Sequence, residues 1–256
     1  MKYYQKLLAM GIFTFSDLVY LTGNKETASS LVQEYQKKQY IVRIKRNLYT
    51  VVRLDTNEVA VNKFEIGSNI NETAYISHHS AFEYHRILNN VYYEVNVSSQ
   101  RKFDKFKFQE HEYIYHQPKI REGVKCDKYN RKIRVTDLER TVLDSIKDFE
   151  KIGGLEELLR CLDRVTYLDH IKLERYLKHF NFQIMYQKAG YILEHFKESL
   201  KLPEKFFLMC QAEIGKSRRY LYREIRAERN IYCKKWQLVV PPDLLSVIST
   251  GVDQPV

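Results

Sequence analysis

The sequence is poor in the residues and patterns that mark fibrous, low-complexity and membrane-spanning chains. Only 9 of its 256 residues are Gly and 5 are Pro, which excludes a collagen-like repeat and disfavours a low-complexity chain. It has no apolar run of about 18 residues, the length a transmembrane helix needs. The apolar stretch near the N-terminus is followed closely by Asp17 and lacks a small-residue cleavage site, so we expect a cytoplasmic protein. Hydrophobic residues make up 44% of the chain, enough for a core in one or two domains.

The cysteine pattern disfavours structural zinc sites and disulfide frameworks. The four cysteines are widely spaced, and the sequence has neither a Cys-x-x-Cys knuckle nor a His-x-x-x-His pair. Zinc ligands and disulfide frameworks follow such spacings. We therefore expect Cys126, Cys161, Cys210 and Cys233 to be buried thiols in a reducing compartment. We expect no bound metal and no cofactor.

Positive charge is concentrated in two segments. The net charge is +10. Residues 1–53 contain nine Lys and Arg against three Asp and Glu, a net of +6, and residues 216–235 contain eight against two, again +6. A compositional bias towards Lys, Asn and Tyr would explain the lysines better than the arginines. Because binding to a phosphate backbone needs locally concentrated Lys and Arg, the pattern predicts one or two surfaces that face a polyanion.

The first 53 residues predict three short helices and a hairpin. Helical apolar spacing predicts a helix over 2–9. A Thr14 cap with Asp17 predicts a second helix to residue 22, and an Asn24 cap predicts a third to about residue 38. Residues 41–45 and 48–52 predict two strands joined at Arg46-Asn47, because Asn tolerates a left-handed backbone. This order is that of a winged helix-turn-helix.

The rest of the chain predicts a larger mixed domain. Strand patterns lie at 74–76, 92–98, 112–116, 123–127 and 132–135, and a last strand begins at Trp236. Helical patterns lie at 78–88 after a Ser77 cap, from a Thr136/Glu139 capping box onward, and at 155–165, 171–180, 182–200 and 204–214. The predicted fold class is therefore α+β. A winged helix-turn-helix at 1–53 and a connecting helix at 54–70 precede a helix-rich α/β C-terminal domain at 71–256.

The third predicted helix has an apolar and a polar face, which suits binding in a DNA major groove. The apolar face carries Ala28, Leu31, Val32 and Tyr35. On the polar side, the residues suited to contact base edges are Thr27, Ser29, Ser30 and Gln33. The residues expected to contact phosphates are Lys25, Lys37, Arg43, Lys45 and Arg46. The sequence thus predicts binding to double-stranded DNA, and the alternative is a winged helix that docks proteins through a solvated basic face.

Several motifs follow in a set order. Ser77-His78-His79-Ser80-Ala81 opens a predicted helix, Arg140-Thr141-Val142-Leu143-Asp144 lies on another, Gly153-Gly154 precedes a third, and Trp236-Gln237-Leu238 with Pro241 comes late. Together with the expected winged helix, this order resembles the AbiEi family of antitoxin-type transcriptional regulators, and the likeness covers most of the chain. The chain departs from the family pattern at the wing, where Arg46-Asn47 stand in place of a common Gly.

The resemblance implies a two-domain protein of a toxin–antitoxin or phage-defence operon. In this family the N-terminal domain binds inverted repeats in its own promoter and represses it, and we expect a homodimer or cooperative binding on DNA. The C-terminal domain carries the antitoxin activity against a nucleotidyltransferase-like toxin, with or without a stable complex. The resemblance therefore implies a DNA-binding autorepressor and antitoxin.

Two groups of polar residues could suggest other chemistry. His78, His79 and Glu83 could suggest a metal site, but on a helix His79 and Glu83 are four residues apart and spaced to pair with each other. His78 and His85 are seven residues apart, which leaves no third ligand at a fixed spacing, so no metal site is predicted. Arg140 and Asp144 are spaced as an i,i+4 ion pair, which favours a structural role.

The sequence predicts no enzyme. It has no Gly-rich phosphate loop, nucleophile elbow or closely spaced pair of aspartates, which are the usual local signatures of phosphoryl and acyl transfer. The alternative is a nucleic-acid enzyme that uses Glu139 and Asp144.

The second basic segment contains a set of five arginines: Arg218, Arg219, Arg223, Arg226 and Arg229. If the segment is helical, Arg219, Arg223 and Arg226 share one face, with Tyr220 and Tyr222 close by. Basic and aromatic residues together suit RNA or single strands. The alternative function is therefore an RNA- or protein-binding adaptor that acts through this face, and the alternative structure is a solvated helix with local ion pairs to Glu224 and Glu228.

Overall fold

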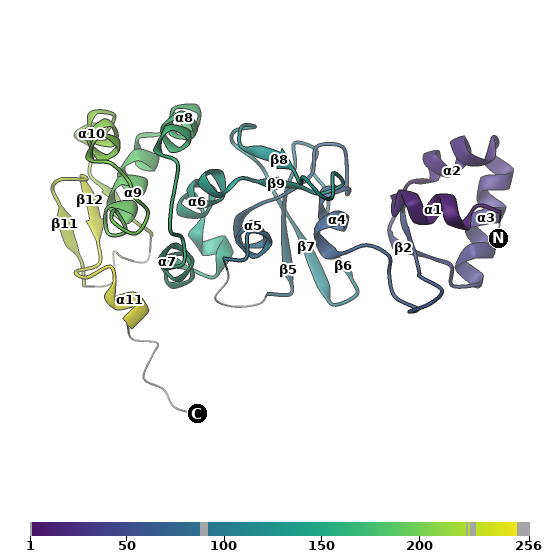
Figure 1. The fold of residues 1–256 in the computed structure, drawn as a ribbon. Helices are drawn as coiled ribbons and strands as arrows, with labels where there is room; N and C mark the ends of the chain where they lie inside the picture. The colour runs from purple at the N-terminus through teal and green to yellow at the C-terminus, as the bar shows by residue number, and fades with distance from the viewer. Residues whose placement is uncertain (1, 88–91, 224, 226–228, 250–256) are drawn as a thin grey trace, which may run out of the picture. The chain divides into compact units, whose positions relative to one another are not determined.

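The computed structural model describes residues 2–87, 92–223, 225 and 229–249. The fold is mixed α+β, as predicted (Figure 1). The chain forms two compact units, each built from more than one segment: residues 1–76, 92–117 and 126–135 form the first, and residues 77–91, 118–125 and 136–256 form the second. Residues 1–76 thus lie in one unit, and the division expected from the sequence, at residues 53 and 70, stays a prediction.

Three short helices open the chain, as expected: α1 (Tyr4–Met10), α2 (Phe15–Thr22) and α3 (Lys25–Lys37). The capping box at α2 is confirmed, because the Thr14 backbone N–H donates to Asp17 at 2.7 Å and the Asp17 N–H donates to Thr14 Oγ1 at 3.3 Å. Asn24 caps α3 by accepting the Thr27 N–H at 2.7 Å. The local cap signals in the sequence therefore define where these helices begin.

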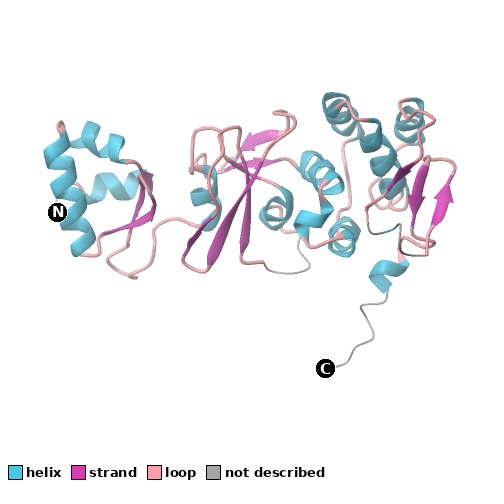
Figure 2. Ribbon diagram, turned by 180° about the vertical axis from the view of Figure 1, so that it is seen from behind, coloured by secondary structure: helices cyan, strands magenta, loops and turns pink. Residues whose placement is uncertain are grey.

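A three-stranded antiparallel sheet completes this segment (Figure 2). Its strands are β1 (Ile12–Phe13), β2 (Ile41–Lys45) and β3 (Leu48–Val51), in the order β1-β3-β2. Asn47 takes the left-handed backbone that the hairpin turn requires, with φ of 61°. Buried residues of the helices, among them Leu7, Leu18 and Val32, pack in one core with Phe13 and Val51 of the sheet. The apolar stripe of each helix thus faces the sheet and the other helices.

The prediction of a connecting helix over residues 54–70 is wrong for the first half of that range. Only α4 (Lys63–Ser68) is helical, and it begins where Asn62 accepts the Glu65 N–H at 3.0 Å. Before it, Val52 forms a β-bridge with Val59, and Asn57 turns the chain with φ of 58°. The apolar residues of this stretch are weakly periodic, but they lie along a turn and a β-bridge. Weak periodicity over so short a stretch does not distinguish such a segment from a helix.

A six-stranded mixed sheet follows, in the order β6-β7-β5-β4-β9-β8. Its strands are β4 (Tyr75–Ile76), β5 (Glu94–Ser98), β6 (Phe106–Phe108), β7 (His111–His116), β8 (Val124–Cys126) and β9 (Arg134–Thr136). Strand β5 pairs parallel with β7 and antiparallel with β4, and β4 pairs parallel with β9. The five predicted strands of this region are confirmed. Strand β6 was missed because three residues on a sheet edge show too little alternation.

The second unit is mostly helical. Its elements are α5 (His78–Tyr84), α6 (Leu138–Lys147), the 3-10 helix η1 (Phe149–Ile152), α7 (Leu155–Asp163), α8 (His170–Phe180), α9 (Gln183–Glu194), α10 (Glu204–Ala212) and α11 (Ser246–Ser249). Helix α6 contacts α5, α8 and α9, and its buried residues join one apolar core with those of α7 to α10. Two predicted helices are shorter than expected: the one over 182–200 ends at Glu194, and the one over 78–88 ends at Tyr84, with Leu88 outside the described residues.

Two predicted helix caps are wrong in their chemistry. Helix α6 is capped by Asp137, which accepts the Arg140 N–H at 3.1 Å, because Thr136 still belongs to strand β9 and bonds Thr141 Oγ1 at 2.8 Å. Ser77 does occupy the N-cap of α5, yet its side chain makes no capping bond, and its hydroxyl bonds His78 Nδ1 at 2.9 Å. In both places another nearby side chain bonds the hydroxyl that was expected to cap the helix.

A small sheet lies near the end of the second unit, and its position depends on one tryptophan. Strand β12 (Leu238–Val240) lies between β10 (Arg219–Tyr220) and β11 (Ile231–Cys233), which confirms the strand predicted after Trp236. The indole of Trp236 is fully buried, and its N–H donates to Glu194 at 2.8 Å. Its ring lies against Gly190 so closely that a Cβ at that residue would come within 2.0 Å of it. Helix α9 and the final sheet thus pack together through a glycine.

None of the described helices is long and apolar enough to cross a membrane.

The contact between Gly190 and Trp236 predicts that a Gly to Ala substitution inside a helix will destabilise the protein. Gly to Ala inside a helix normally stabilises it by about 1 kcal/mol, but Gly190→Ala is expected to lower the free energy of unfolding by about 1–3 kcal/mol through overpacking. Urea denaturation followed by tryptophan fluorescence measures the change. Lys178→Ala, at an exposed site in α8, is the control and should change stability by less than about 0.5 kcal/mol. A stabilised Gly190→Ala variant would contradict the packing seen here.

Candidate functional site

The outer face of α3 is the first candidate site. Thr27, Ser29, Ser30 and Gln33 are all exposed, as are Lys25 and Lys37. The buried residues of the helix are the four of the predicted apolar stripe: Ala28, Leu31, Val32 and Tyr35. The face opposite the core is thus free of large apolar side chains and rich in groups that donate and accept hydrogen bonds, as a base-contacting helix requires.

One end of this face contains an exposed ion pair. Lys38 Nζ lies 2.6 Å from Glu34 Oε1, with both side chains about half exposed. The hydrogen bond and charge of Lys38 lower the pKa of the Glu34 carboxyl. An exposed i,i+4 pair of this kind contributes little to stability, but it offsets the negative charge of Glu34 at this end of the polar face.

The tip of the β2–β3 hairpin lies beside the start of α2. The Asn47 side chain accepts the Phe15 N–H at 3.0 Å, so the turn is joined to the first residue of that helix. Arg46, next to it, is exposed. Arg43 is also exposed, and its Nε donates to the Lys45 carbonyl at 3.3 Å across the bulge in β2. Two of the predicted phosphate-contacting arginines thus extend from a hairpin whose turn is held in place.

Lys45 lies in a different environment from the other predicted phosphate contacts. Its Nζ lies 5.3 Å from the ring centre of Phe103 and 5.2 Å from that of Phe106. Burial lowers the pKa of this ammonium group, as expected where water is replaced by aromatic rings. The sequence placed Lys45 on the hairpin but could not show that distant aromatic residues pack against it.

The histidines predicted not to bind metal make separate contacts. His79 Nε2 lies 3.1 Å from Glu157 Oε1 on α7, so a carboxylate from another helix pairs with it. His78 Nε2 lies 3.9 Å from Asp148. Within the described ranges, no group of three His, Cys, Asp or Glu residues could hold a metal ion. The two histidines join α5 to the helices that follow it.

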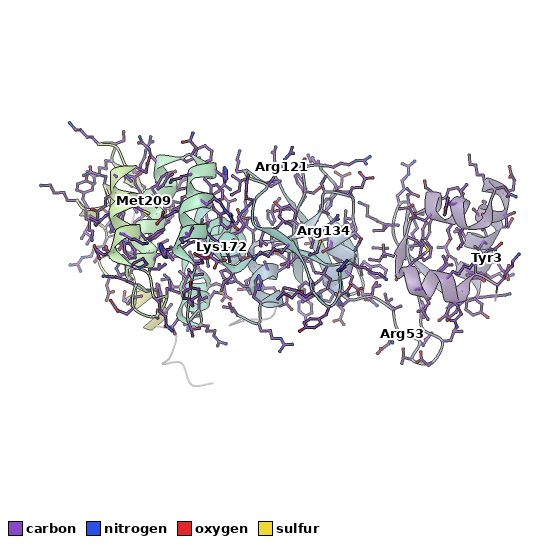
Figure 3. The ribbon with its side chains drawn as sticks, turned by 45° about the horizontal axis from the view of Figure 1, so that its top comes forward. Tyr3, Arg53, Arg121, Arg134, Lys172 and Met209 are labelled. Atoms are coloured by element: carbon purple, nitrogen blue, oxygen red, sulfur yellow. The ribbon has the colours of Figure 1, made fainter. Side chains whose placement is uncertain are left out.

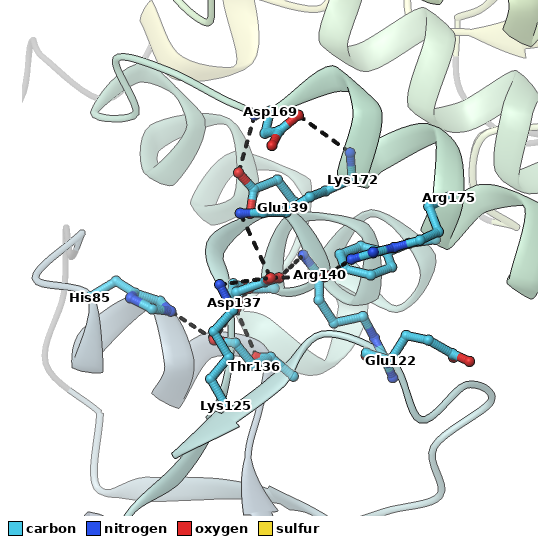
Figure 4. Close-up of polar contacts among 12 residues, drawn as sticks. His85, Glu122, Lys125, Thr136, Asp137, Glu139, Arg140, Asp169, Lys172 and Arg175 are labelled. Atoms are coloured by element: carbon cyan, nitrogen blue, oxygen red, sulfur yellow. Dashed lines mark hydrogen bonds and ion pairs between the residues drawn. The ribbon is translucent and has the colours of Figure 1, made fainter. Parts of the chain in front are cut away.

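A second candidate site is the ionic network at the start of α6, drawn in Figure 4. Asp137 is almost fully buried and accepts the hydroxyl of Tyr176 at 2.8 Å. Two lysines approach the same carboxylate, Lys125 at 3.5 Å and Lys172 at 3.9 Å. Burial and the bond to Asp137 raise the pKa of the Tyr176 phenol to about 12. Asp137 thus caps α6 and also joins it to β8 and α8.

Glu139 extends this network towards α8. Its carboxylate accepts the Lys172 ammonium at 2.9 Å and the Asp169 N–H at 3.1 Å. Partial burial lowers the pKa of Lys172, but the bond to Glu139 and the nearby carboxylates outweigh this and raise it. Glu139 therefore holds the start of α8 against α6. The sequence singled out Glu139 as half of a capping box and did not identify Lys125 or Lys172, because they come from separate segments with no common motif.

The predicted Arg140–Asp144 pair is confirmed and is buried. Arg140 Nε donates to Asp144 at 2.9 Å, with the two side chains 0% and 7% exposed. Arg140 Nη1 also donates to the Glu122 carbonyl at 2.6 Å. Gly123 approaches so closely that a Cβ there would come within 2.7 Å of Arg140 Cβ. The arginine thus joins α6 to the segment before β8, and this geometry favours a structural role in which Arg140 holds the two segments together.

The late arginines do not form the helical face considered from the sequence. Arg219 lies in strand β10, and the guanidinium of Arg218 lies 5.1 Å from the ring centre of Tyr232. Arg223 and Arg229 follow in irregular structure, and Arg226 lies outside the described residues. The prediction that Arg219, Arg223 and Arg226 share one face of a helix is therefore wrong, because Arg219 pairs with Leu238 in the final sheet.

Comparison of the sequence with models of protein families and with curated proteins finds no match.

Burial of the Arg140–Asp144 pair predicts a large cost for removing one partner. Arg140→Ala should lower the free energy of unfolding by about 3–5 kcal/mol, because Asp144 is left buried without its partner charge. The double variant Arg140→Met, Asp144→Leu should recover much of this loss, since it buries no lone charge. Chemical denaturation measures both.

The control for this prediction is Arg160→Ala. Arg160 pairs with Glu156 at 2.8 Å, also at i,i+4 spacing, but the Glu156 side chain is 51% exposed. We expect its loss to cost about 0.2–1 kcal/mol. Equal costs for Arg140→Ala and Arg160→Ala would show that burial does not govern the first pair.

Proposed function

We propose that residues 1–53 form a winged helix-turn-helix through which the protein binds double-stranded DNA. The observation that carries the proposal is the exposed polar face of α3, which carries Gln33, Ser30 and Lys37 opposite its buried stripe. Such a helix can enter a major groove with its apolar side still packed on the domain.

The arrangement of the neighbouring elements supports this proposal. Helix α2 comes directly before α3, as the first helix of a helix-turn-helix does, and β2 and β3 follow as a hairpin that extends a sheet begun by β1. Arg43 and Arg46 are exposed on this hairpin. We assign them to phosphate contacts together with Lys25 and Lys37, because each can pair with a phosphate without disturbing the core.

A base contact and a phosphate contact should respond differently to substitution. Gln33→Ala is expected to weaken binding to the cognate site about tenfold and to leave binding to a scrambled duplex nearly unchanged, since Gln pairs specifically with adenine. Arg46→Ala should weaken binding to both duplexes and reduce the slope of log K against log salt by about 1. Fluorescence anisotropy on the upstream DNA of the gene, at several salt concentrations, measures both effects.

Tyr20→Ala is the matched control for these variants, because Tyr20 is 94% exposed on α2 and the proposal assigns it no DNA contact. If Gln33→Ala lowers affinity equally for the cognate and scrambled duplexes, Gln33 does not contact bases. Binding of the unchanged protein to neither duplex would contradict the proposed function itself.

We further propose that the protein is a cytoplasmic autorepressor and antitoxin of a toxin–antitoxin operon. The support is the motif order that resembles the AbiEi family. The first of these motifs includes the buried His79, and the second includes the buried Arg140–Asp144 pair. Under this proposal the N-terminal segment binds promoter repeats, as a dimer or cooperatively, and the C-terminal part neutralises a nucleotidyltransferase-like toxin. The proposed activity is binding, without catalysis.

The alternative is an adaptor that binds RNA or protein through the arginines of residues 218–229. Its strongest support is the aromatic environment of Arg218 beside Tyr232. It has less support than DNA binding, because the described arginines of this range are divided between a strand and irregular structure.

The two proposed activities should be separable in the full-length chain. Arg46→Ala combined with Gln33→Ala should abolish repression of a promoter reporter and leave toxin neutralisation intact, because the substitutions lie in the N-terminal segment. Growth of cells that express a nucleotidyltransferase-like toxin gene, if one is found beside the gene of this protein, measures neutralisation. Charge reversal of Arg218 and Arg219 is the comparison. Loss of neutralisation in that variant alone, with folding retained, would favour the adaptor function.

A further inference from the structure

A polar groove lies beside the hairpin tip within the first unit. It has a volume of about 680 Å³ and is lined by the hairpin, by the loop from Asn69 to Glu72 and by the loop from Arg101 to Asp104. The basic residues along it are Lys45, Arg46, Arg101, Lys102 and Arg134, against the two acidic residues Glu72 and Asp104. Of these basic residues, Arg101, Lys102 and Arg134 lie outside the segment to which we assign DNA contacts.

Lys45, on the hairpin, contacts the loop from Arg101 to Asp104 on the other side of this groove. Its ammonium group lies over the rings of Phe103 and Phe106, each just over 5 Å from the ring centre. Phe103 is buried, and its neighbours Arg101 and Lys102 are exposed. The cation–π contacts therefore hold Arg46, at the hairpin tip, on the same side of the unit as the Arg101–Lys102 pair.

Arg134 lines the groove and holds one of its loops in place. Its guanidinium donates to the carbonyls of Glu72 at 2.7 Å, Ala74 at 2.9 Å and Asn71 at 2.9 Å, and also to that of Ser68. Figure 3 labels this residue within the first unit. These partners are neutral carbonyl oxygens, so the positive charge of Arg134 is not cancelled by a carboxylate bound to it. The guanidinium N–H groups of Arg134 already donate to backbone carbonyls. Arg134 therefore acts on a bound anion through its positive electrostatic field.

The loop that presents Arg101 is held by a hydrogen-bond network. The Arg101 N–H donates to Ser99 Oγ at 3.1 Å, and the Arg101 carbonyl accepts Ser99 Oγ at 2.9 Å and Asn71 Nδ2 at 3.1 Å. Ser99 Oγ also bonds Thr73 Oγ1 at 2.8 Å. The backbone at Arg101 is thus fixed to the same loop that Arg134 holds, so less conformational entropy is lost when its side chain binds an anion.

We propose that this groove binds the phosphate backbone of the same DNA duplex that α3 and the hairpin contact. Arg101 and Lys102 contact phosphates beyond the hairpin tip, and Arg134 supports them electrostatically. The inference rests on the proposed function, because it is the hairpin tip on the duplex that brings phosphates to the groove. It extends the DNA contacts beyond residues 1–53 and makes affinity depend on the length of the duplex.

The test is the double variant Arg101→Ala, Lys102→Ala in the full-length protein. Its matched control is Lys128→Ala, Arg131→Ala, which removes one Lys and one Arg that are exposed in the same unit and do not line the groove. On a long duplex with the cognate site, the groove variant should bind about tenfold more weakly at physiological salt, with the slope of log K against log salt reduced by about 2. The control should differ little from the unchanged protein.

Duplex length separates the groove from a general charge effect. On a duplex shortened at the end next to the hairpin, the unchanged protein should lose affinity and the groove variant should not, because it has already lost those contacts. Circular dichroism and the midpoint of thermal unfolding verify that both variants are folded.

The possible failures are distinguishable. If the unchanged protein binds its upstream DNA but the groove variant behaves like the control, the groove does not contact DNA and the proposed function stands. If the unchanged protein binds no DNA, the proposed function and this inference are both overturned.

Discussion

The first unit depends on one half-buried guanidinium, that of Arg134. Arg134 reaches from β9 to carbonyl oxygens of the α4–β4 connection, more than 60 residues earlier in the chain, and its own N–H bonds Ser68 Oγ at 3.0 Å. Burial of a cation is costly unless its donors are satisfied. Here the satisfying groups are backbone carbonyls, so the loop must keep one conformation for the charge to be tolerated. Burial also lowers the pKa of Arg134, which remains far above neutrality for a guanidinium.

The same principle recurs in the second unit with different groups. Arg140 and Asp137 lie at the start of α6 and bond residues from neighbouring segments, among them the Glu122 carbonyl and the Tyr176 hydroxyl. Each unit thus has an apolar core together with charged side chains that hold separate segments in register. Such groups are weak contributors to net stability when paired and costly when one partner is lost. They determine which segments lie together more than how tightly the core is packed.

Charge on the first unit is organised differently from charge in these buried networks. The exposed basic residues of α3 and the hairpin lie on a surface whose local structure is set by caps, a turn and a small apolar core. Lys45 links that surface to the aromatic residues near β6. A surface so arranged can present cations to a phosphate backbone without reorganising, which limits the entropy cost of binding. This is the physical basis for our proposal that the hairpin and the adjoining groove bind one ligand.

Local signals in the sequence determined much of the N-terminal segment and little of the sites. The caps at Thr14 and Asn24, the apolar stripe of α3 and the left-handed Asn47 all act within a few residues, so the sequence alone predicts them. Only the tertiary structure decided the roles of Lys45, Asp137 and Arg134, because their partners come from distant segments that no periodicity connects. It also decided that Arg219 lies in a strand, since the pairing with β12 outweighs the local helical pattern. Local patterns specify where elements begin and end, and long-range polar contacts specify which side chains meet.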